Sequence, residues 1–223
     1  MFLPKIETGI WSVVLTIFCV IGLTNSFNFI DGIDGLCAGL ALTAIGSILI
    51  FAFFNNGLIF LEDKEYLLLI CLSIVCFLIF NITSFSKVFL GDSGSMFLGF
   101  LVSWLLIMTS QSENQIIHPI LTIWCVTIPV FDIISVVTRR ILRGINPFKP
   151  DRRHIHHLLL ELGINNHIVS LLIIVFAILL NFFGLMVFIS FGPFPSLLSF
   201  LLLLFLYLIF MIFLSRSIYK KNI

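Results

Sequence analysis

The first residues that could do chemistry form an Asn- and Asp-rich run after an apolar stretch. Asn25, Asn28, Asp31 and Asp34 recur every three residues, and a glycine follows each aspartate. Asp-Gly pairs are typical of tight turns, so a helix end and a turn would account for one such pair. Two pairs preceded by two asparagines exceed what a turn needs, because polar clusters at a membrane boundary are costly without a use. The spacing therefore predicts a functional site on a turn.

A second cluster runs from Lys87 to Ser95 and combines small residues with one carboxylate, in the order Gly91-Asp92-Ser93-Gly94-Ser95. An apolar run follows, so the cluster is expected at the start of a helix, where backbone N–H groups and a bound cation can approach a phosphate together. Oxygen ligands such as Asp92 and Asn28 suit Mg²⁺, which binds through one or two carboxylates plus substrate phosphates. The alternative is an ordinary helix N-cap, since Asp and Ser are common there.

The third cluster is the basic stretch 139–157, which ends in His154, His156 and His157 and holds half of the twelve basic residues. A zinc site is disfavoured because no cysteine or suitably spaced fourth ligand accompanies the histidines. Arginines and histidines near carboxylates and a cation site favour binding of a diphosphate. For Arg139 and Arg140, contact with anionic lipid is an equal alternative. Asp132, which precedes the stretch, is either a structural partner of a cation or a site residue.

The elements that must position these clusters are membrane helices. The chain has 223 residues, of which 60% are hydrophobic and 10% charged, with 26 Phe and a net charge of +1. A soluble domain has roughly one charged residue in four, so a soluble enzyme and a disordered chain are excluded. The neutral balance excludes a nucleic-acid binder. Five uncharged stretches reach or approach the roughly 20 residues that cross a bilayer, and a sixth is long enough for two spans. The sequence predicts an all-α, polytopic membrane protein with a single domain, 1–223, and about seven transmembrane helices centred near Leu15, Ile45, Leu72, Val102, Val126, Ile174 and Tyr207.

Orientation follows from the basic residues of the loops, which are enriched on the cytoplasmic side of membrane proteins. With the N-terminus outside, ten basic residues fall on the inner side and only Lys5 and Lys64 on the outer side. The C-terminus is then cytoplasmic, and all three clusters lie at the cytoplasmic face. The five cysteines lie in or beside apolar runs and are interpreted as small core residues.

Taken in order, the three clusters resemble the polyprenyl-phosphate N-acetylhexosamine-1-phosphate transferase family, which belongs to glycosyltransferase family 4. The family pattern Asn-x-x-Asn-x-x-Asp-Gly-x-Asp-Gly-Leu matches Asn25 through Leu36, and Gly-Asp-x-Gly-Ser matches Gly91 to Ser95. The run from Pro150 to Leu158 looks most like the branch that uses UDP-N-acetylglucosamine and undecaprenyl phosphate. The resemblance covers the chain from about Ile10 onward.

This resemblance implies an enzyme of the bacterial cytoplasmic (inner) membrane that transfers GlcNAc-1-phosphate from a UDP-sugar to undecaprenyl phosphate, with release of UMP, to initiate a cell-surface polysaccharide. Mg²⁺, or alternatively Mn²⁺, is the implied cofactor, with Asp92 as the main ligand and Asn28 nearby. The implied catalytic residues are Asp92, Asp31, Asp34, His154, His156 and His157. The implied substrate-binding residues are Asn25, Asn28, Asp31, Asp34, Arg152, Arg153, His156 and His157. The expected partners are the UDP-sugar, undecaprenyl phosphate and membrane lipid, without nucleic acid.

The sequence departs from the family pattern in one respect. Family members have additional N-terminal helices with an Asp-Asp-rich motif, and this chain contains no Asp-Asp pair. One expectation is that a complementing N-terminal fragment supplies these helices, or that the protein forms a homodimer. The alternative is a non-catalytic remnant or membrane subunit. A transporter that uses Asp31, Asp34 and Asp132 is disfavoured because the charged clusters lie at one membrane face rather than at the midplane.

Overall fold

The computed structural model describes residues 10–54, 64–83, 87–111, 116–146 and 154–221. Within these ranges all the regular structure is helical. The helices are α1 (Ile10–Ile30), α2 (Leu36–Phe54), α3 (Lys64–Ile82), α4 (Gly91–Gln111), α5 (Pro119–Cys125), α6 (Thr127–Leu142), α7 (Ile155–Glu161), α8 (Asn166–Phe191) and α9 (Pro193–Lys221). The predicted all-α, polytopic class is confirmed.

Six of these helices are long and apolar enough to cross a membrane: α1, α2, α3, α4, α8 and α9. The predicted fifth span is a broken one, because α5 and α6 meet at an angle of 76°. The break has a local cause in Pro129. Its ring lacks an N–H and clashes with the carbonyl four residues earlier, which belongs to Cys125, the last residue of α5. Counting this bent pair as one span gives the predicted seven.

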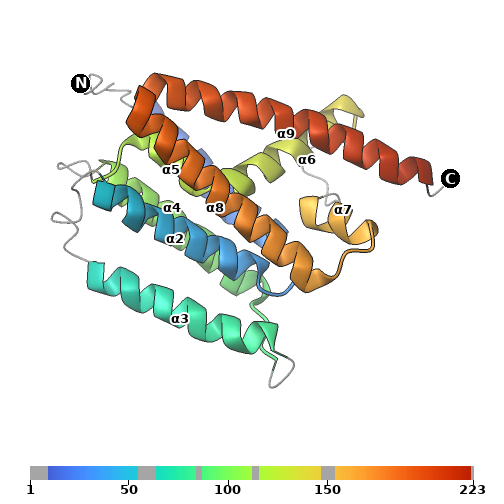
Figure 1. Cartoon of the computed structure of the whole chain (residues 1–223), viewed down its shortest axis with the longest axis horizontal. Coiled ribbons are helices and arrows are strands. Elements are labelled where there is room, and N and C mark those ends of the chain that lie inside the picture. The colour runs from blue at the N-terminus through green and yellow to red at the C-terminus, as the bar shows by residue number, and fades with distance from the viewer. Residues whose placement is uncertain (1–9, 55–63, 84–86, 112–115, 147–153, 222–223) are drawn as a thin grey trace.

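The helices are arranged around α2, which is the most buried of the candidate spans. In Figure 1, α2, α4 and α8 run side by side, α3 lies along one edge against α2, and α9 crosses α6 and α8. The helix α1 packs closely along α4. A Cβ on Gly99 would lie 2.8 Å from the Cα of Thr24 and 3.0 Å from the Cβ of Phe27. This close approach joins the helix that precedes the first polar cluster to the helix that follows the second.

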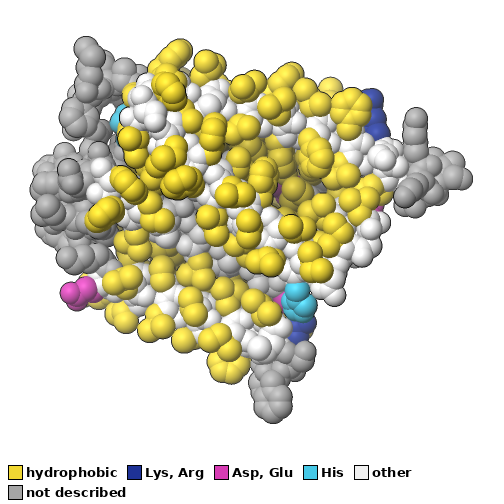
Figure 2. All heavy atoms as spheres, viewed as in Figure 1, with side chains coloured by type: hydrophobic (Ala, Val, Ile, Leu, Met, Phe, Trp, Pro, Cys, Tyr) yellow, Lys and Arg dark blue, Asp and Glu magenta, His cyan; other side chains and the backbone are white. Residues whose placement is uncertain are grey.

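Polar groups at the break between α5 and α6 find hydrogen-bond partners inside the protein. Thr127 Oγ1 donates to the Trp124 carbonyl oxygen at 2.7 Å, and Trp124 Nε1 donates to Ser196 Oγ of α9 at 3.0 Å. Backbone groups freed at membrane depth need such partners, because lipid provides none. Figure 2 shows that hydrophobic side chains cover most of the face in view, as expected for a lipid-facing bundle.

Candidate active site

The first cluster forms a turn between two helices, as the sequence predicts. The turn spans Asp31 to Gly35, between the end of α1 and the start of α2. Gly35 has a φ of +79°, which side chains with a Cβ rarely adopt. Its N–H donates to Asn81 Oδ1 of α3 at 2.7 Å, and Asn81 Nδ2 donates to the Val88 carbonyl at 2.8 Å. Asn81 therefore ties the turn to the segment that leads into α4.

Asp34 makes two further contacts that fix the turn. Its Oδ2 lies 2.7 Å from Lys87 Nζ, and its backbone carbonyl accepts a hydrogen bond from Ser170 Oγ of α8 at 2.8 Å. Lys87 also lies over the Phe89 ring at 5.1 Å. The Asp34 side chain thus holds a cation of the second cluster, in addition to its predicted role toward substrate.

The second cluster opens α4 beside this turn. Asp92 is exposed in the first turn of α4, and Ser95 Oγ donates to Asn28 Oδ1 at 2.8 Å. Partial burial and the negative charges of Asp92 and Asp34 raise the pKa of Asp31 to about 6. Three carboxylates therefore share one electrostatic environment, and a cation or a bound proton would relieve their repulsion.

The third cluster reaches the site through α7. His154 is the residue before this helix, and its Nδ1 lies 2.7 Å from Oδ2 of Asp132 in α6. The other oxygen of Asp132 accepts from the Ile155 N–H at 2.9 Å. Asp132 therefore has its side-chain partner in the third cluster, and this contact ties α6 to the start of α7. The His154 ring also lies 5.6 Å from the Phe29 ring of the first cluster.

His156 lies against the backbone of the turn. It is fully buried, and neither ring nitrogen has a hydrogen-bond partner. Its ring is 4.1 Å from that of His157 and 6.0 Å from that of His154. A Cβ at Gly32 would collide with His156 Nε2, so only glycine leaves room for the ring. Burial, and then the neighbouring His157, lower the pKa of His156 to about 3, which leaves the ring neutral at pH 7.

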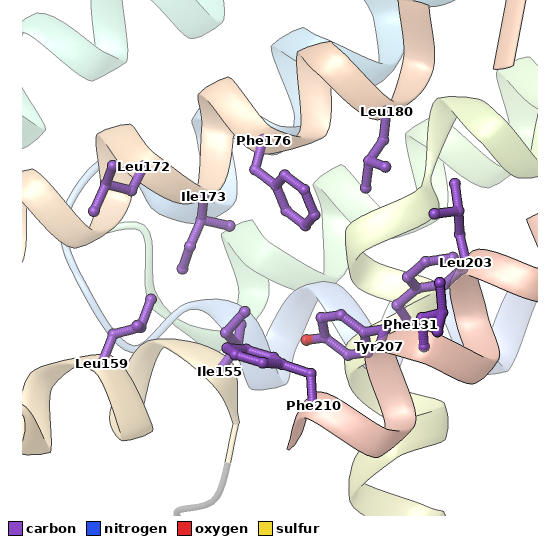
Figure 3. A pocket seen from close by; sticks show the side chains of 11 residues that line it. Phe131, Ile155, Leu159, Leu172, Ile173, Phe176, Leu180, Leu203, Tyr207 and Phe210 are labelled. Carbon is purple, nitrogen blue, oxygen red and sulfur yellow. The ribbon is translucent and has the colours of Figure 1, made fainter. Parts of the chain in front are cut away.

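An apolar cavity of about 480 Å³ adjoins the buried pair of Asp132 and His154. Figure 3 shows its walls, which come from α6, α7, α8 and α9. They include Phe131 and Ile155, the chain neighbours of Asp132 and His154, together with Leu172, Ile173, Phe176, Leu180 and Tyr207. The cavity is therefore lined almost entirely by hydrophobic side chains, two of which are chain neighbours of Asp132 and His154.

Comparison with known proteins shows which family this chain resembles. Residues 1–110 match the family model for glycosyl transferase family 4. The chain is 34% identical over 192 residues to the undecaprenyl-phosphate alpha-N-acetylglucosaminyl 1-phosphate transferase of Escherichia coli K12, an alignment that covers 80% of this chain and 50% of the relative. The chain is thus similar to members of glycosyl transferase family 4.

Two further relatives carry similar names. The corresponding transferase of Yersinia pestis is 34% identical over 79% of this chain and 48% of its own length. A probable undecaprenyl-phosphate N-acetylglucosaminyl 1-phosphate transferase of Bacillus subtilis is 33% identical over 76% of this chain and 46% of its own. The chain therefore spans about half the length of the curated relatives it matches.

The structure brings most of the predicted site residues to one end of the bundle, but not all. Asn25 donates instead to the Ile21 carbonyl of its own helix at 2.8 Å. Arg152 and Arg153 lie outside the described residues. Arg139 and Arg140 are buried, and Arg139 donates to Ser135 at 3.2 Å, so these two arginines pack inside the protein rather than facing lipid headgroups.

A divalent cation fits this site by charge rather than by a complete set of protein ligands. Among the described residues, no group of three or more His, Cys, Asp or Glu side chains is placed to hold a metal ion. The predicted pair, Asp92 and Asn28, offers oxygen donors beside the carboxylates that raise the pKa of Asp31. Mg²⁺ often binds through so few protein ligands, because water and substrate phosphates complete its shell.

Asn81 was missed by reasoning from the sequence. It is a single amide in the otherwise apolar run of α3, where a polar residue has no evident role until its partners are known. Its burial and its two backbone partners make it part of the support of the site. The one available signal was the rarity of an amide side chain in a membrane span.

Proposed function

We propose that this chain carries out, alone or with a complementing segment, the transfer of GlcNAc-1-phosphate from UDP-N-acetylglucosamine to undecaprenyl phosphate, with release of UMP. The observation that carries the proposal is the convergence of three separate polar clusters at one end of the bundle. Ser95 bonds to Asn28, Lys87 pairs with Asp34, and His156 packs on Gly32. The names of the relatives support the choice of sugar and lipid carrier.

In the proposed reaction, an oxygen of the lipid phosphate attacks the β-phosphorus of the UDP-sugar. The bond from that phosphorus to the bridging oxygen breaks, and UMP leaves with the bond's electron pair. Phosphoryl transfer depends on positioning and on neutralising negative charge, since the protein has little covalent chemistry to do. Bound Mg²⁺, or Mn²⁺, would supply part of that neutralisation.

The residues of this chain divide the remaining work. Asp92 and Asn28 would hold the cation, and Asp31 and Asp34 would help to orient the nucleotide. His154, His157, Arg152 and Arg153 would bind the diphosphate and the lipid phosphate. His156 is suited to a neutral hydrogen-bonding role, because burial disfavours its charged form.

We assign the prenyl chain of the lipid substrate to the cavity between α6 and α9. An apolar chain gains free energy by entering an apolar cavity, and this one begins beside the histidines proposed to bind the phosphate. The excess of basic residues on the same side of the bundle supports a cytoplasmic active face in the inner membrane.

A transfer assay tests the proposal. Membranes that contain the protein are incubated with radiolabelled UDP-N-acetylglucosamine, undecaprenyl phosphate and Mg²⁺, and label in extracted lipid is measured. We expect label with the wild type and its loss in Asp92→Asn. The matched control is Glu65→Gln, which changes an exposed carboxylate in the first turn of α3, away from the site.

The assay is run with the chain alone and with a co-expressed membrane segment that carries an Asp-Asp motif. Lipid label in either arm, dependent on Asp92, supports the proposed transfer. Absence of label in both arms, with the protein present and folded, contradicts it and favours a non-catalytic membrane subunit.

A further inference from the structure

Asp132 is a carboxylate buried completely within α6, and its relative exposure is 0%. Burying a charged group away from water is costly unless hydrogen bonds replace its hydration. Both of its oxygens are used: Oδ2 faces His154 Nδ1 at 2.7 Å, and Oδ1 accepts from the Ile155 N–H at 2.9 Å. The Asp132 carboxylate therefore binds both the His154 ring and the backbone of Ile155, at the start of α7.

This geometry has a consequence for the histidine ring. A carboxylate accepts hydrogen bonds and does not donate them, so the hydrogen must lie on Nδ1 of His154. In the neutral ring the other nitrogen, Nε2, then carries a lone pair, and it is the nitrogen left for a ligand. The position of the ring is defined further by Phe29 at 5.6 Å and by the nearly parallel ring of His156 at 6.0 Å.

From this geometry, we infer that Asp132 is a positioning residue for the proposed transfer: it fixes the tautomer and orientation of His154, so that Nε2 accepts a proton or a hydrogen bond from substrate. The inference rests on the proposed function and adds to it a residue that never touches substrate. The same arrangement of carboxylate, imidazole and reacting group occurs in the Ser-His-Asp triad, where the carboxylate holds the imidazole in one tautomer.

The variant Asp132→Asn isolates this role because asparagine keeps the shape of the side chain. Its carbonyl oxygen can still accept from the Ile155 N–H, and its amide then donates to Nδ1 of His154. This reverses the tautomer and puts the hydrogen on Nε2. We expect a folded protein whose kcat falls about 10²–10⁴-fold, the usual contribution of a positioned acid or base, while KM for the UDP-sugar changes less than about threefold.

The control variant is Ser135→Ala, one helical turn from Asp132 on the same helix. Ser135 is also fully buried and hydrogen-bonded, but its partner is Arg139 rather than His154. It measures the cost of losing a buried polar contact in α6, and we expect its kcat to stay within about threefold of wild type, as for a change outside the site.

A double-mutant cycle with His154→Gln separates positioning from a general structural role. If Asp132 acts through His154, Asp132→Asn costs nothing further in kcat once His154 is replaced. Independent losses that multiply in the double variant overturn the inference, and so does a kcat of Asp132→Asn equal to that of Ser135→Ala. If Asp132→Asn does not fold, the charge itself is the structural requirement, and this too overturns the inference. An inactive wild type contradicts the proposed function instead.

Discussion

Replacing Gly32 with alanine tests the contact that joins the first cluster to the third. An added Cβ would collide with His156 Nε2 and lie 3.0 Å from Cδ2 and 3.1 Å from Cε1 of the same ring. The His156 ring has little room to move, because it is fully buried and its centroid lies 4.1 Å from that of the His157 ring. The turn and α7 must therefore move apart.

The expected magnitude follows from the size of that displacement. Overpacking by one methyl group typically costs about 1–3 kcal/mol of stability. Moving a catalytic group by about 1 Å can lower the rate by about 10²-fold. We therefore expect Gly32→Ala to lose about 10²-fold in transfer activity, with a modest fall in the melting temperature measured in detergent.

Gly22→Ala is the matched control, because nothing lies within 4 Å of a Cβ at that position of α1. Alanine is favoured over glycine by about 1 kcal/mol inside a helix, so this variant should be at least as stable as wild type and equally active. Adding His156→Ala to Gly32→Ala should restore stability but not activity. If Gly32→Ala matches Gly22→Ala in both melting temperature and activity, the packing of His156 on the turn is refuted.

Three further outcomes are expected. Asn81→Ala leaves the buried Gly35 N–H without its partner, at about 1–3 kcal/mol, and removes the contact with the Val88 carbonyl, so it should lower the melting temperature more than Ser73→Ala, whose hydroxyl bonds within α3. Burial and neighbouring carboxylates raise the pKa of Asp31 to about 6, above the value of about 4 expected in the unfolded chain. In the metal-free protein, the contribution of Asp31 to the free energy of unfolding is therefore fully present below about pH 4 and is lost as the pH rises through 6. A melting temperature independent of pH across this window would contradict that assignment, and added Mg²⁺ should reverse the loss. Leu206→Trp fills the cavity and should raise KM for undecaprenyl phosphate, whereas Leu202→Trp, equally exposed on α9 but outside the cavity, should not; equal effects would place the prenyl chain elsewhere.

Local patterns in the sequence predicted much of the site. The turn after α1 is encoded by glycines next to aspartates, and the start of α4 by small residues before an apolar run, as the structure confirms. The convergence of the three clusters also followed, because chain connectivity and the distribution of basic residues place all of them at one end of the bundle. The orientation of that end toward the cytoplasm stays a prediction.

Contacts between distant helices were not predictable in the same way. The roles of Asn81 and Gly32 depend on their spatial neighbours, Gly35 and His156, and the type of either residue does not indicate which neighbour it contacts. The partner of Asp132, His154, lies 22 residues further along the chain, and the sequence does not show that the two meet. The break near Val126 has a local cause in Pro129, but predicting spans from the lengths of uncharged stretches does not detect such a break.

The broken fifth span also bears on how the protein enters the membrane. The helix α5 has 7 residues and α6 has 16, and at about 1.5 Å per residue neither crosses an apolar core about 30 Å thick. A charged residue at the centre of an inserting helix costs about 2.5–3.5 kcal/mol, and α6 carries Asp132. This segment is therefore a poor substrate for insertion by itself. Its stable integration should await α8 and α9, which supply Ser196 and cover the break. Asp132 of α6 would then reach His154 only late in biogenesis, so the active site is completed after most of the chain has been synthesised.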